Sequence, residues 1–234
     1  MKNKIALVTG AGKRIGQAIA IHLVELKYDV VVHYSSSELG AEQTKSKIEE
    51  LGGKAYLIQS DLAESYAPKE LIREITQVFG SLDLLVNSAS TYPEPDRIQS
   101  KHSFDKESEE EWEEAIAVNT RAPFFLIKYA SPLLQKSENG IVINILDRSV
   151  DEMITTRAAH TISKNALKTV TELGAKSFGD SFRICSLLLG RILPGEKMSE
   201  EEVSKINWIG ISPVLKRLEE LILSGITGKT YFVK

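Results

Sequence analysis

The residues of this chain best suited to acid–base chemistry are an aspartate, a histidine and a lysine in its second half. His160 and Lys164 are four residues apart in a segment of helical period, which places both side chains on one helix face. Asp147 follows an apolar run of strand length, 13 residues before His160. A carboxylate stabilises a protonated imidazole, so Asp147 and His160 can form a proton donor at mildly acidic pH. The alternative is that His160 is a polar side chain that only lines a cleft.

The first apolar run is joined to the first segment of helical period by a glycine-rich string, TGAGKRIG over residues 9–16. Glycines at such a junction let the backbone approach a pyrophosphate closely, and the amides of the helix N-terminus hold its charge. A plain strand-to-helix turn is the alternative, but the position between the first strand and the first helix favours a dinucleotide site. The residues predicted to bind the cofactor here are Gly10, Lys13, Arg14, Ile15 and Gly16.

The end of the second predicted strand indicates which dinucleotide is bound. A carboxylate there would bond the ribose 2′-hydroxyl of NAD and repel the 2′-phosphate of NADP, and this chain has none. We therefore expect NADP(H), with Lys13 and Arg14 supplying positive charge and Arg14 making a bidentate contact to the 2′-phosphate. The alternatives are that both cations are solvated loop residues and that the strand-end histidine makes only a local hydrogen bond. The residues predicted at this position are His33, Tyr34, Ser35 and Ser36.

Apolar runs of strand length alternate with segments of helical period along the whole chain, and the runs are continuous, as in strands buried on both faces. The pattern predicts one doubly wound α/β Rossmann domain over residues 1–234, with about seven parallel strands and helices on both faces. Strands are predicted at 4–9, 29–34, 54–59, 82–87, 140–146, 182–189 and 229–233. Helices are predicted at 14–27, 38–51, 68–79, 108–135, 158–178 and 212–224.

The composition of the chain excludes several classes of binding partner. The 234 residues carry 29 Lys and Arg against 32 Asp and Glu, a net charge of −3, which argues against nucleic acid and favours a small-molecule partner. No apolar run reaches the roughly 18 residues of a membrane span and the start is polar, so we expect a cytoplasmic protein with no membrane partner. A single cysteine, Cys185, excludes an internal disulfide, and the four scattered histidines show no metal-ligand spacing, so no structural metal is expected.

Several motifs resemble the short-chain dehydrogenase/reductase family. The first loop reads TGxxxRxG, the string NSAS at 87–90 stands where the family has NNAG, and Asn119 stands at the family's active-site asparagine. Asp147 and Lys164 match the family's active-site positions, but His160 replaces its tyrosine. The resemblance implies that Lys164 grips the nicotinamide ribose, that Asn119 supports Lys164, and that Asp147 is the proton-relay group. The further cofactor contacts that it implies are Asp61, Leu62, Asn87, Ser88, Ala89 and Gly190.

More narrowly, the strings GKRIG, VNSASTYP, NTRAPFFLIK and INILD look like the pteridine reductase and dihydromonapterin reductase branch. That branch has an Arg in the first loop and an Asp in place of the family's active-site Ser, here Arg14 and Asp147. Tyr92 and Pro93 match its aromatic–proline stretch beside the pteridine pocket. Cys185 and Leu189 depart from the family's usual Asn and Pro.

The resemblance implies an NADPH-dependent oxidoreductase that transfers a hydride to a C=N or C=O of a small substrate. The substrate is open between a pterin and an acyl or sugar carbonyl, and because the tyrosine is missing a catalytically silent NADP(H)-binding protein, a sensor or an inactive partner subunit, stays open too. The family's four-helix interface implies a homodimer or homotetramer. The apolar side chains expected to serve it are Phe124, Phe125, Ile127, Leu133 and Leu134.

Overall fold

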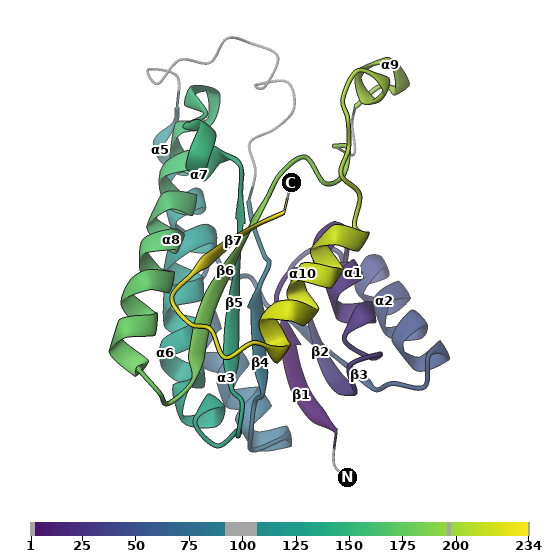
Figure 1. The fold of residues 1–234 in the computed structure, drawn as a ribbon, viewed down its shortest axis with the longest axis vertical. Helices are drawn as coiled ribbons and strands as arrows, with labels where there is room; N and C mark the ends of the chain where they lie inside the picture. Colours follow the sequence, from purple (N-terminus) through teal and green to yellow (C-terminus); the bar gives the residue numbers. More distant parts are fainter. Residues whose placement is uncertain (1–2, 92–106, 196–197, 234) are drawn as a thin grey trace.

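Seven parallel strands form one sheet in the order β3-β2-β1-β4-β5-β6-β7 in a computed structural model that describes residues 3–91, 107–195 and 198–233 (Figure 1). The strands are β1 (Lys4–Val8), β2 (Tyr28–Tyr34), β3 (Ala55–Gln59), β4 (Leu84–Asn87), β5 (Ile141–Asp147), β6 (Arg183–Leu189) and β7 (Thr230–Val233). The seven-stranded parallel sheet predicted from the continuous apolar runs is confirmed.

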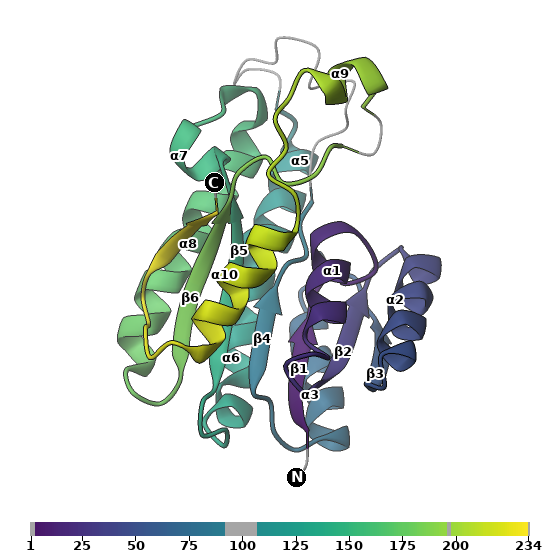
Figure 2. The same cartoon turned by 45° about the vertical axis from the view of Figure 1, so that its right-hand side comes forward.

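Helices cover both faces of the sheet. One layer is formed by α1, α2 and α10 and the other by α3, α6 and α8, with the sheet between them (Figures 1 and 2). The longer helices are α1 (Arg14–His22), α2 (Glu38–Glu50), α3 (Ala67–Val78), α5 (Glu109–Ile116), α6 (Ala122–Leu134), α8 (Ala158–Phe178) and α10 (Ser212–Leu223). This is the doubly wound arrangement that alternating strands and helices predict.

The core is split by the sheet into two clusters, because successive strand side chains point to opposite faces. In β1, Ala6 and Val8 pack toward α1 and α10, whereas Ile5 and Leu7 pack toward α3 and α6. All four side chains are almost fully buried. Burial on both faces explains why the strands read as continuous apolar runs rather than as an alternation.

The long helix predicted over residues 108–135 is interrupted. α5 runs into a π-helical turn, η2 (Ala117–Arg121), before α6 begins. Pro123 stands in the first turn of α6 and has no N–H, so it cannot donate to the carbonyl four residues earlier, that of Asn119. The wider turn at this point is the local response to that missing hydrogen bond.

Other boundaries also differ from prediction. α1 ends at His22 rather than at residue 27, because the chain tightens into turns in which Val24 and Glu25 donate to carbonyls three residues back. Three short elements were missed because none is long enough to show an apolar period: α7 (Ser149–Glu152), η3 (Thr155–Arg157) and α9 (Glu200–Ser204). Tyr92 and Pro93 lie outside the described residues.

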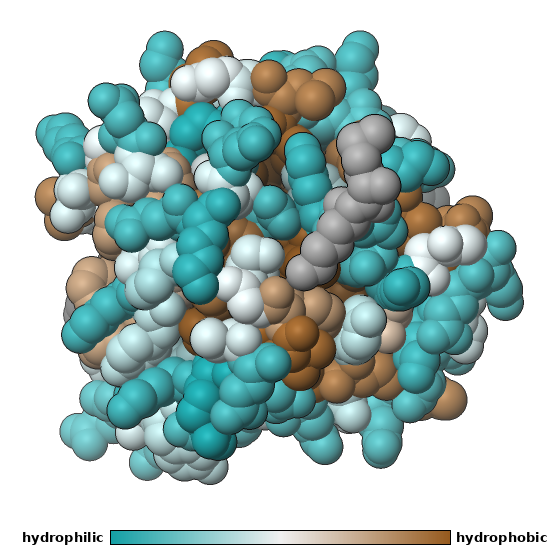
Figure 3. Space-filling model, turned by 90° about the horizontal axis from the view of Figure 1, so that it is seen from below, coloured by the Kyte–Doolittle hydropathy of each residue, from teal (hydrophilic) through white to brown (hydrophobic). Residues whose placement is uncertain are grey.

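The end of the molecule at which the strands begin lies opposite the end that carries the predicted site. Figure 3 views this end, where hydrophilic residues surround smaller hydrophobic areas. Among the described helices, none combines the length and the apolar character needed to cross a membrane.

Candidate active site

The predicted site residues lie where the parallel strands end. β1 and β4 are neighbours in the sheet although β2 and β3 follow β1 in the chain, so the order reverses between them. Ligands of open parallel sheets bind at such a reversal, beside the carboxyl ends of the strands. Thr9 joins the two loops there: its hydroxyl oxygen accepts from the amides of Ser88 and Ala89, each at 3.0 Å.

The glycines of the first loop are required by close backbone approaches. Gly10 has φ +65°, and a Cβ on it would lie 2.8 Å from the Cα of Ala89. A Cβ on Gly12 would lie 2.3 Å from the Ser37 hydroxyl oxygen, and one on Gly16 would lie 2.3 Å from the Gly10 carbonyl oxygen. The N-cap residue of α1, Lys13, makes no side-chain cap, so the first amides of the helix can bind an anion. The residues present fit the pyrophosphate of a dinucleotide.

The side chain of Arg14 forms hydrogen bonds within the protein. Its backbone has φ +54°, a region that favours glycine, and its guanidinium donates to the carbonyl oxygens of Pro194 at 2.8 Å and Leu193 at 3.4 Å. In this structure Arg14 bonds the segment after β6, and its bidentate contact to a 2′-phosphate stays a prediction. The exposed cation beside the Gly12–Ser37 contact is Lys13.

His33 lies beneath the loop rather than on its surface. Its Nδ1 accepts from the Gly10 amide at 3.3 Å, and its Nε2 lies 3.1 Å from the Ser60 carbonyl oxygen. The ring is only 1% exposed. Burial lowers the pKa of His33 to about 4, against an opposing hydrogen bond from the ring to Ser60. His33 is thus a neutral support for the phosphate loop, which corrects its predicted role as a direct phosphate donor.

The remaining predicted cofactor residues divide into exposed and buried groups. Ser35, Ser36 and Asp61 are exposed at the ends of β2 and β3, whereas the side chains of Tyr34 and Leu62 are buried. The latter two can therefore offer a ligand only their backbone. Three others lie around the carboxyl ends of the strands as predicted: Ile15 in α1, Asn87 at the end of β4 and Gly190 after β6.

His160 and Asp147 form a close pair, as the sequence predicted. The Nε2 of His160 lies 2.7 Å from Oδ2 of Asp147, and the His160 side chain is 2% exposed against 32% for Asp147. Burial alone would raise the pKa of Asp147, but the hydrogen bond and charge of His160, the charge of Lys164 and the Ser149 amide outweigh burial and hold that pKa well below its usual range. Asp147 is thus a carboxylate, and it is the member of the pair that reaches solvent.

Both ring nitrogens of His160 lie near polar groups. Nδ1 lies 3.1 Å from the carbonyl oxygen of Thr91 and 3.5 Å from Nδ2 of Asn119, and Nε2 faces the Asp147 carboxylate. The ring is thus held in a fixed orientation toward Asp147.

Lys164 is buried at the centre of the site. It is 3% exposed, and its Nζ donates to the Ile145 carbonyl oxygen at 3.0 Å. Burial lowers the pKa of Lys164, and the nearby charge of Asp147 opposes that effect. The site therefore combines two basic groups with one carboxylate at the end of β5.

Asn119 serves the site through neighbours other than Lys164. Its Oδ1 accepts from the Thr91 amide at 3.1 Å, and its Nδ2 donates to the Ser163 hydroxyl at 3.0 Å. Asn119 thus accepts from the Thr91 amide, and the His160 ring contacts the Thr91 carbonyl. Thr91 could not be predicted from its residue type, because it contacts His160 through its backbone carbonyl.

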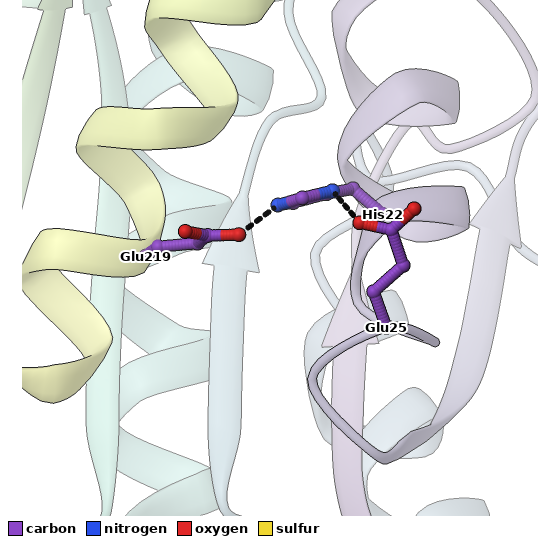
Figure 4. A group of neighbouring side chains, drawn as sticks. All are labelled: His22, Glu25 and Glu219. Carbon is purple, nitrogen blue, oxygen red and sulfur yellow. Dashed lines mark hydrogen bonds and ion pairs between the residues drawn. The ribbon is translucent and has the colours of Figure 1, made fainter.

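A separate group of possible metal ligands joins α1 to α10. Donor atoms of His22, Glu25 and Glu219 lie within 4.8 Å of one another (Figure 4). The two nitrogens of the ring face different carboxylates, Nδ1 toward Glu25 at 3.0 Å and Nε2 toward Glu219 at 2.8 Å. The ring separates the two carboxylates, which is the geometry of an ion pair that links two helices.

The chain is similar to oxidoreductases of one known family. A family model described as short chain dehydrogenase matches residues 4–201. An uncharacterized oxidoreductase of Thermotoga maritima is 29% identical over 205 residues, which are 88% of this chain and 76% of that protein. The 3-oxoacyl-(acyl-carrier-protein) reductase FabG of Staphylococcus epidermidis is 35% identical over 143 residues, which are 61% of this chain and 56% of FabG.

A solved structure covers the chain more fully. FolM alternative dihydrofolate reductase 1 of Brucella canis, complexed with NADP, superimposes with a TM-score of 0.88 at 26% identity, over 100% of this chain and 93% of that one. The match of the family model to most of the chain agrees with the strand order, the glycine loop and the position of Lys164. The chain belongs to the short-chain dehydrogenase family.

Proposed function

We propose that this protein is an NADPH-dependent reductase of a C=N or C=O bond in a small molecule. The observation that carries the proposal is the 2.7 Å contact between His160 and Asp147 beside the buried Lys164, at the same sheet edge as the glycine loop. The cofactor is NADP(H), which supplies the hydride. The chain's own residues must then bind it, orient the substrate and deliver one proton.

The glycine loop and Lys164 would bind the cofactor. The N-terminus of α1 holds the pyrophosphate, and Lys164 holds the hydroxyls of the nicotinamide ribose, as the family resemblance implies. Because Asp147 lies close to Lys164, its carboxylate balances the charge of this buried ammonium.

Asp147 and His160 would deliver the proton to the substrate. When the substrate is reduced, its oxygen or nitrogen gains negative charge and takes up one proton. That proton would pass from Nε2 of His160 to Oδ2 of Asp147, across 2.7 Å, and from this partly exposed carboxylate to the substrate, so Asp147 remains ionised. His160 is left neutral and is reprotonated from water through the same carboxylate, so the pair ends each cycle as it began.

The favoured substrate is a dihydropterin, reduced at C=N. The structure of FolM, which is named as an alternative dihydrofolate reductase, matches the whole chain, and the sequence motifs resemble the pteridine reductase branch. FabG, whose name specifies a 3-oxoacyl substrate, is matched over only 61% of this chain. An acyl carbonyl is the second candidate for that reason.

Stopped-flow measurement of NADPH oxidation tests the function. Dihydrobiopterin, dihydrofolate and a 3-oxoacyl thioester are each mixed with protein and NADPH, and NADPH binding is titrated by fluorescence on the same sample. Turnover of a dihydropterin supports the proposal. Tight NADPH binding without turnover of any of the three compounds contradicts it and supports the silent NADP(H)-binding protein, which the nearly complete burial of His160 favours.

Cofactor preference is expected to depend on Lys13. NADPH should bind at least tenfold more tightly than NADH, about 1.4 kcal/mol, because Lys13, Ser35 and Ser36 are exposed after the first two strands, where we expect the 2′-phosphate to bind. Lys13→Ser should remove most of that preference and leave NADH binding nearly unchanged, as measured by fluorescence titration. Lys47→Ser, which removes an exposed lysine elsewhere, is the control. Equal affinities for the two cofactors in the wild type would contradict the prediction.

Assembly is proposed through α5, α6 and α8, and of the five side chains first expected, Phe124 is exposed there. Ile127, Leu133 and Leu134 are buried in the protomer's own core, so they cannot serve an interface. The exposed apolar side chains on these helices are Trp112, Phe124, Ile162 and Leu173. We propose that two copies meet on this surface. The cytoplasmic location expected from the sequence likewise stays a proposal.

Light scattering tests the assembly. A species of at least twice 25.9 kDa is expected at micromolar concentration, because exposed apolar surface of this kind gains free energy when a second copy covers it. Phe124→Glu should shift the protein toward the monomer. Leu39→Glu, on the opposite layer and also exposed, should not. A wild-type monomer would rule the interface out.

A further inference from the structure

The first turn of α8 is capped by a residue far away in the chain. Arg157, at the N-cap position of α8, makes no side-chain cap. Instead Glu107 accepts two hydrogen bonds, one from the Ala158 amide to Oε2 at 3.2 Å and one from the Ala159 amide to Oε1 at 3.0 Å. One carboxylate thus satisfies two successive amides that an isolated helix would leave without partners.

The backbone that carries Glu107 is itself held in place. The next residue, Ser108, caps α5 through a reciprocal pair of hydrogen bonds: its hydroxyl accepts from the Glu111 amide, and its own amide donates to the Glu111 carboxylate. Glu107 therefore connects the beginning of α5 to the beginning of α8. Because the two helices are fixed to each other at their first turns, α8 cannot slide along its axis without breaking these bonds.

His160 is the third residue of α8, directly after the two amides that Glu107 holds. We propose that Glu107 is a positioning residue that sets the His160 ring against Asp147 and the Thr91 carbonyl. This inference rests on the proposed reductase function. A shift of the first turn would change both ring contacts at once, and proton transfer is sensitive to displacements well below 1 Å.

Glu107 also affects the charge balance at His160. The N-terminus of a helix carries partial positive charge, which disfavours an imidazolium in the first turn, and a carboxylate at that end offsets it. The carboxylate of Asp147 likewise favours an imidazolium at His160, whereas the positive charge of Lys164 disfavours it. Among the described residues, the charged groups near the ring or its immediate neighbours are Asp147 on β5, Lys164 on α8, Glu107 before α5, and Glu114 on α5, which accepts from the Thr91 hydroxyl; Arg157 is the N-cap residue of α8.

Two substitutions of Glu107 test the proposal. Glu107→Ala removes both acceptors, and we expect kcat to fall about 10-fold while the Kd for NADPH stays within about twofold of wild type. Glu107→Gln keeps one acceptor, so it should lose less activity. Glu110→Gln, which removes an exposed charge from the next turn without touching α8, should keep the wild-type kcat.

The pH profile separates positioning from a purely structural role. The rate should fall as pH rises, because only the protonated pair donates, and Glu107→Gln should move the half-maximal pH down by about 0.5 unit. Lower thermal stability alone would leave that pH unchanged. If both Glu107 variants keep the wild-type kcat and half-maximal pH, the proposal is wrong even though the reductase function stands.

A measurement without substrate keeps the two proposals distinct. The side-chain nitrogen signals of His160 are followed by NMR against pH, assigned by their loss in His160→Gln. A protonation midpoint that falls in Glu107→Gln and stays constant in Glu110→Gln supports the placement of Glu107, whether or not turnover is found. An identical midpoint in both variants would overturn it.

Discussion

Asp147→Asn is expected to slow NADPH-dependent reduction by about 10²- to 10³-fold and to leave the Kd for NADPH within about twofold of wild type. The carboxylate is the partly exposed member of the pair, and its Oδ2 receives the hydrogen bond of His160 at 2.7 Å. An amide at this position can neither take the proton from Nε2 nor pass it to substrate. Single-turnover stopped flow, with enzyme in excess, measures the hydride step directly.

The control for Asp147→Asn removes the same charge close by. Asp151 is exposed on α7, beyond the pair, so Asp151→Asn should change the single-turnover rate by less than about twofold. If Asp147→Asn keeps the wild-type rate, the proton comes from another group or from water. The proton relay would then have to be abandoned.

Stability is expected to fall by about 2 kcal/mol between pH 7.5 and pH 5 because of His33 alone. Burial lowers the pKa of His33 to about 4, whereas an unfolded histidine titrates near 6.5. Between these values the unfolded chain binds a proton that the folded chain does not, so the free energy of unfolding decreases as the pH falls from about 6.5 toward 4. Below pH 4 both states are protonated and this loss stops growing.

Urea unfolding at the two pH values tests the His33 prediction. In His33→Gln, which cannot titrate, the difference in unfolding free energy between pH 7.5 and pH 5 should shrink by about 2 kcal/mol, even if the variant is less stable at both. If His33→Gln keeps the full wild-type difference, His33 is not the group that titrates.

The fold could be predicted because strands that are buried on both faces of a sheet have continuous apolar sequences. The break between α5 and α6 was also readable in principle, since Pro123 cannot donate a hydrogen bond inside a helix. The short elements α7 and α9 could not be predicted, because helices of four or five residues are held by their surroundings rather than by a sequence period.

The location of the candidate site was predicted better than the contacts of its side chains. Asp147 and His160 were paired correctly because strand ends and helix starts meet at one sheet edge. The buried position of His33 and the hydrogen bond of Arg14 were not predicted, because their partners come from elsewhere in the chain: the His33 ring contacts the Ser60 carbonyl, and Arg14 donates to the Pro194 carbonyl. Glu107 was missed for the same reason, since nothing in an acidic run shows which carboxylate reaches a helix 51 residues away.

The π turn at Ala117–Arg121 fixes the rotational phase of everything that follows it. Each residue of an α-helix advances the side-chain direction by about 100°. With its extra residue, the turn lets Asn119 face α8 while Leu126 and Leu133 face the sheet and α3. Because the turn already absorbs one extra residue, a deletion within it would restore a regular α-helix and keep the apolar stripe of α6 in the core, whereas a deletion of one residue within α6 would rotate the positions beyond it by about 100°.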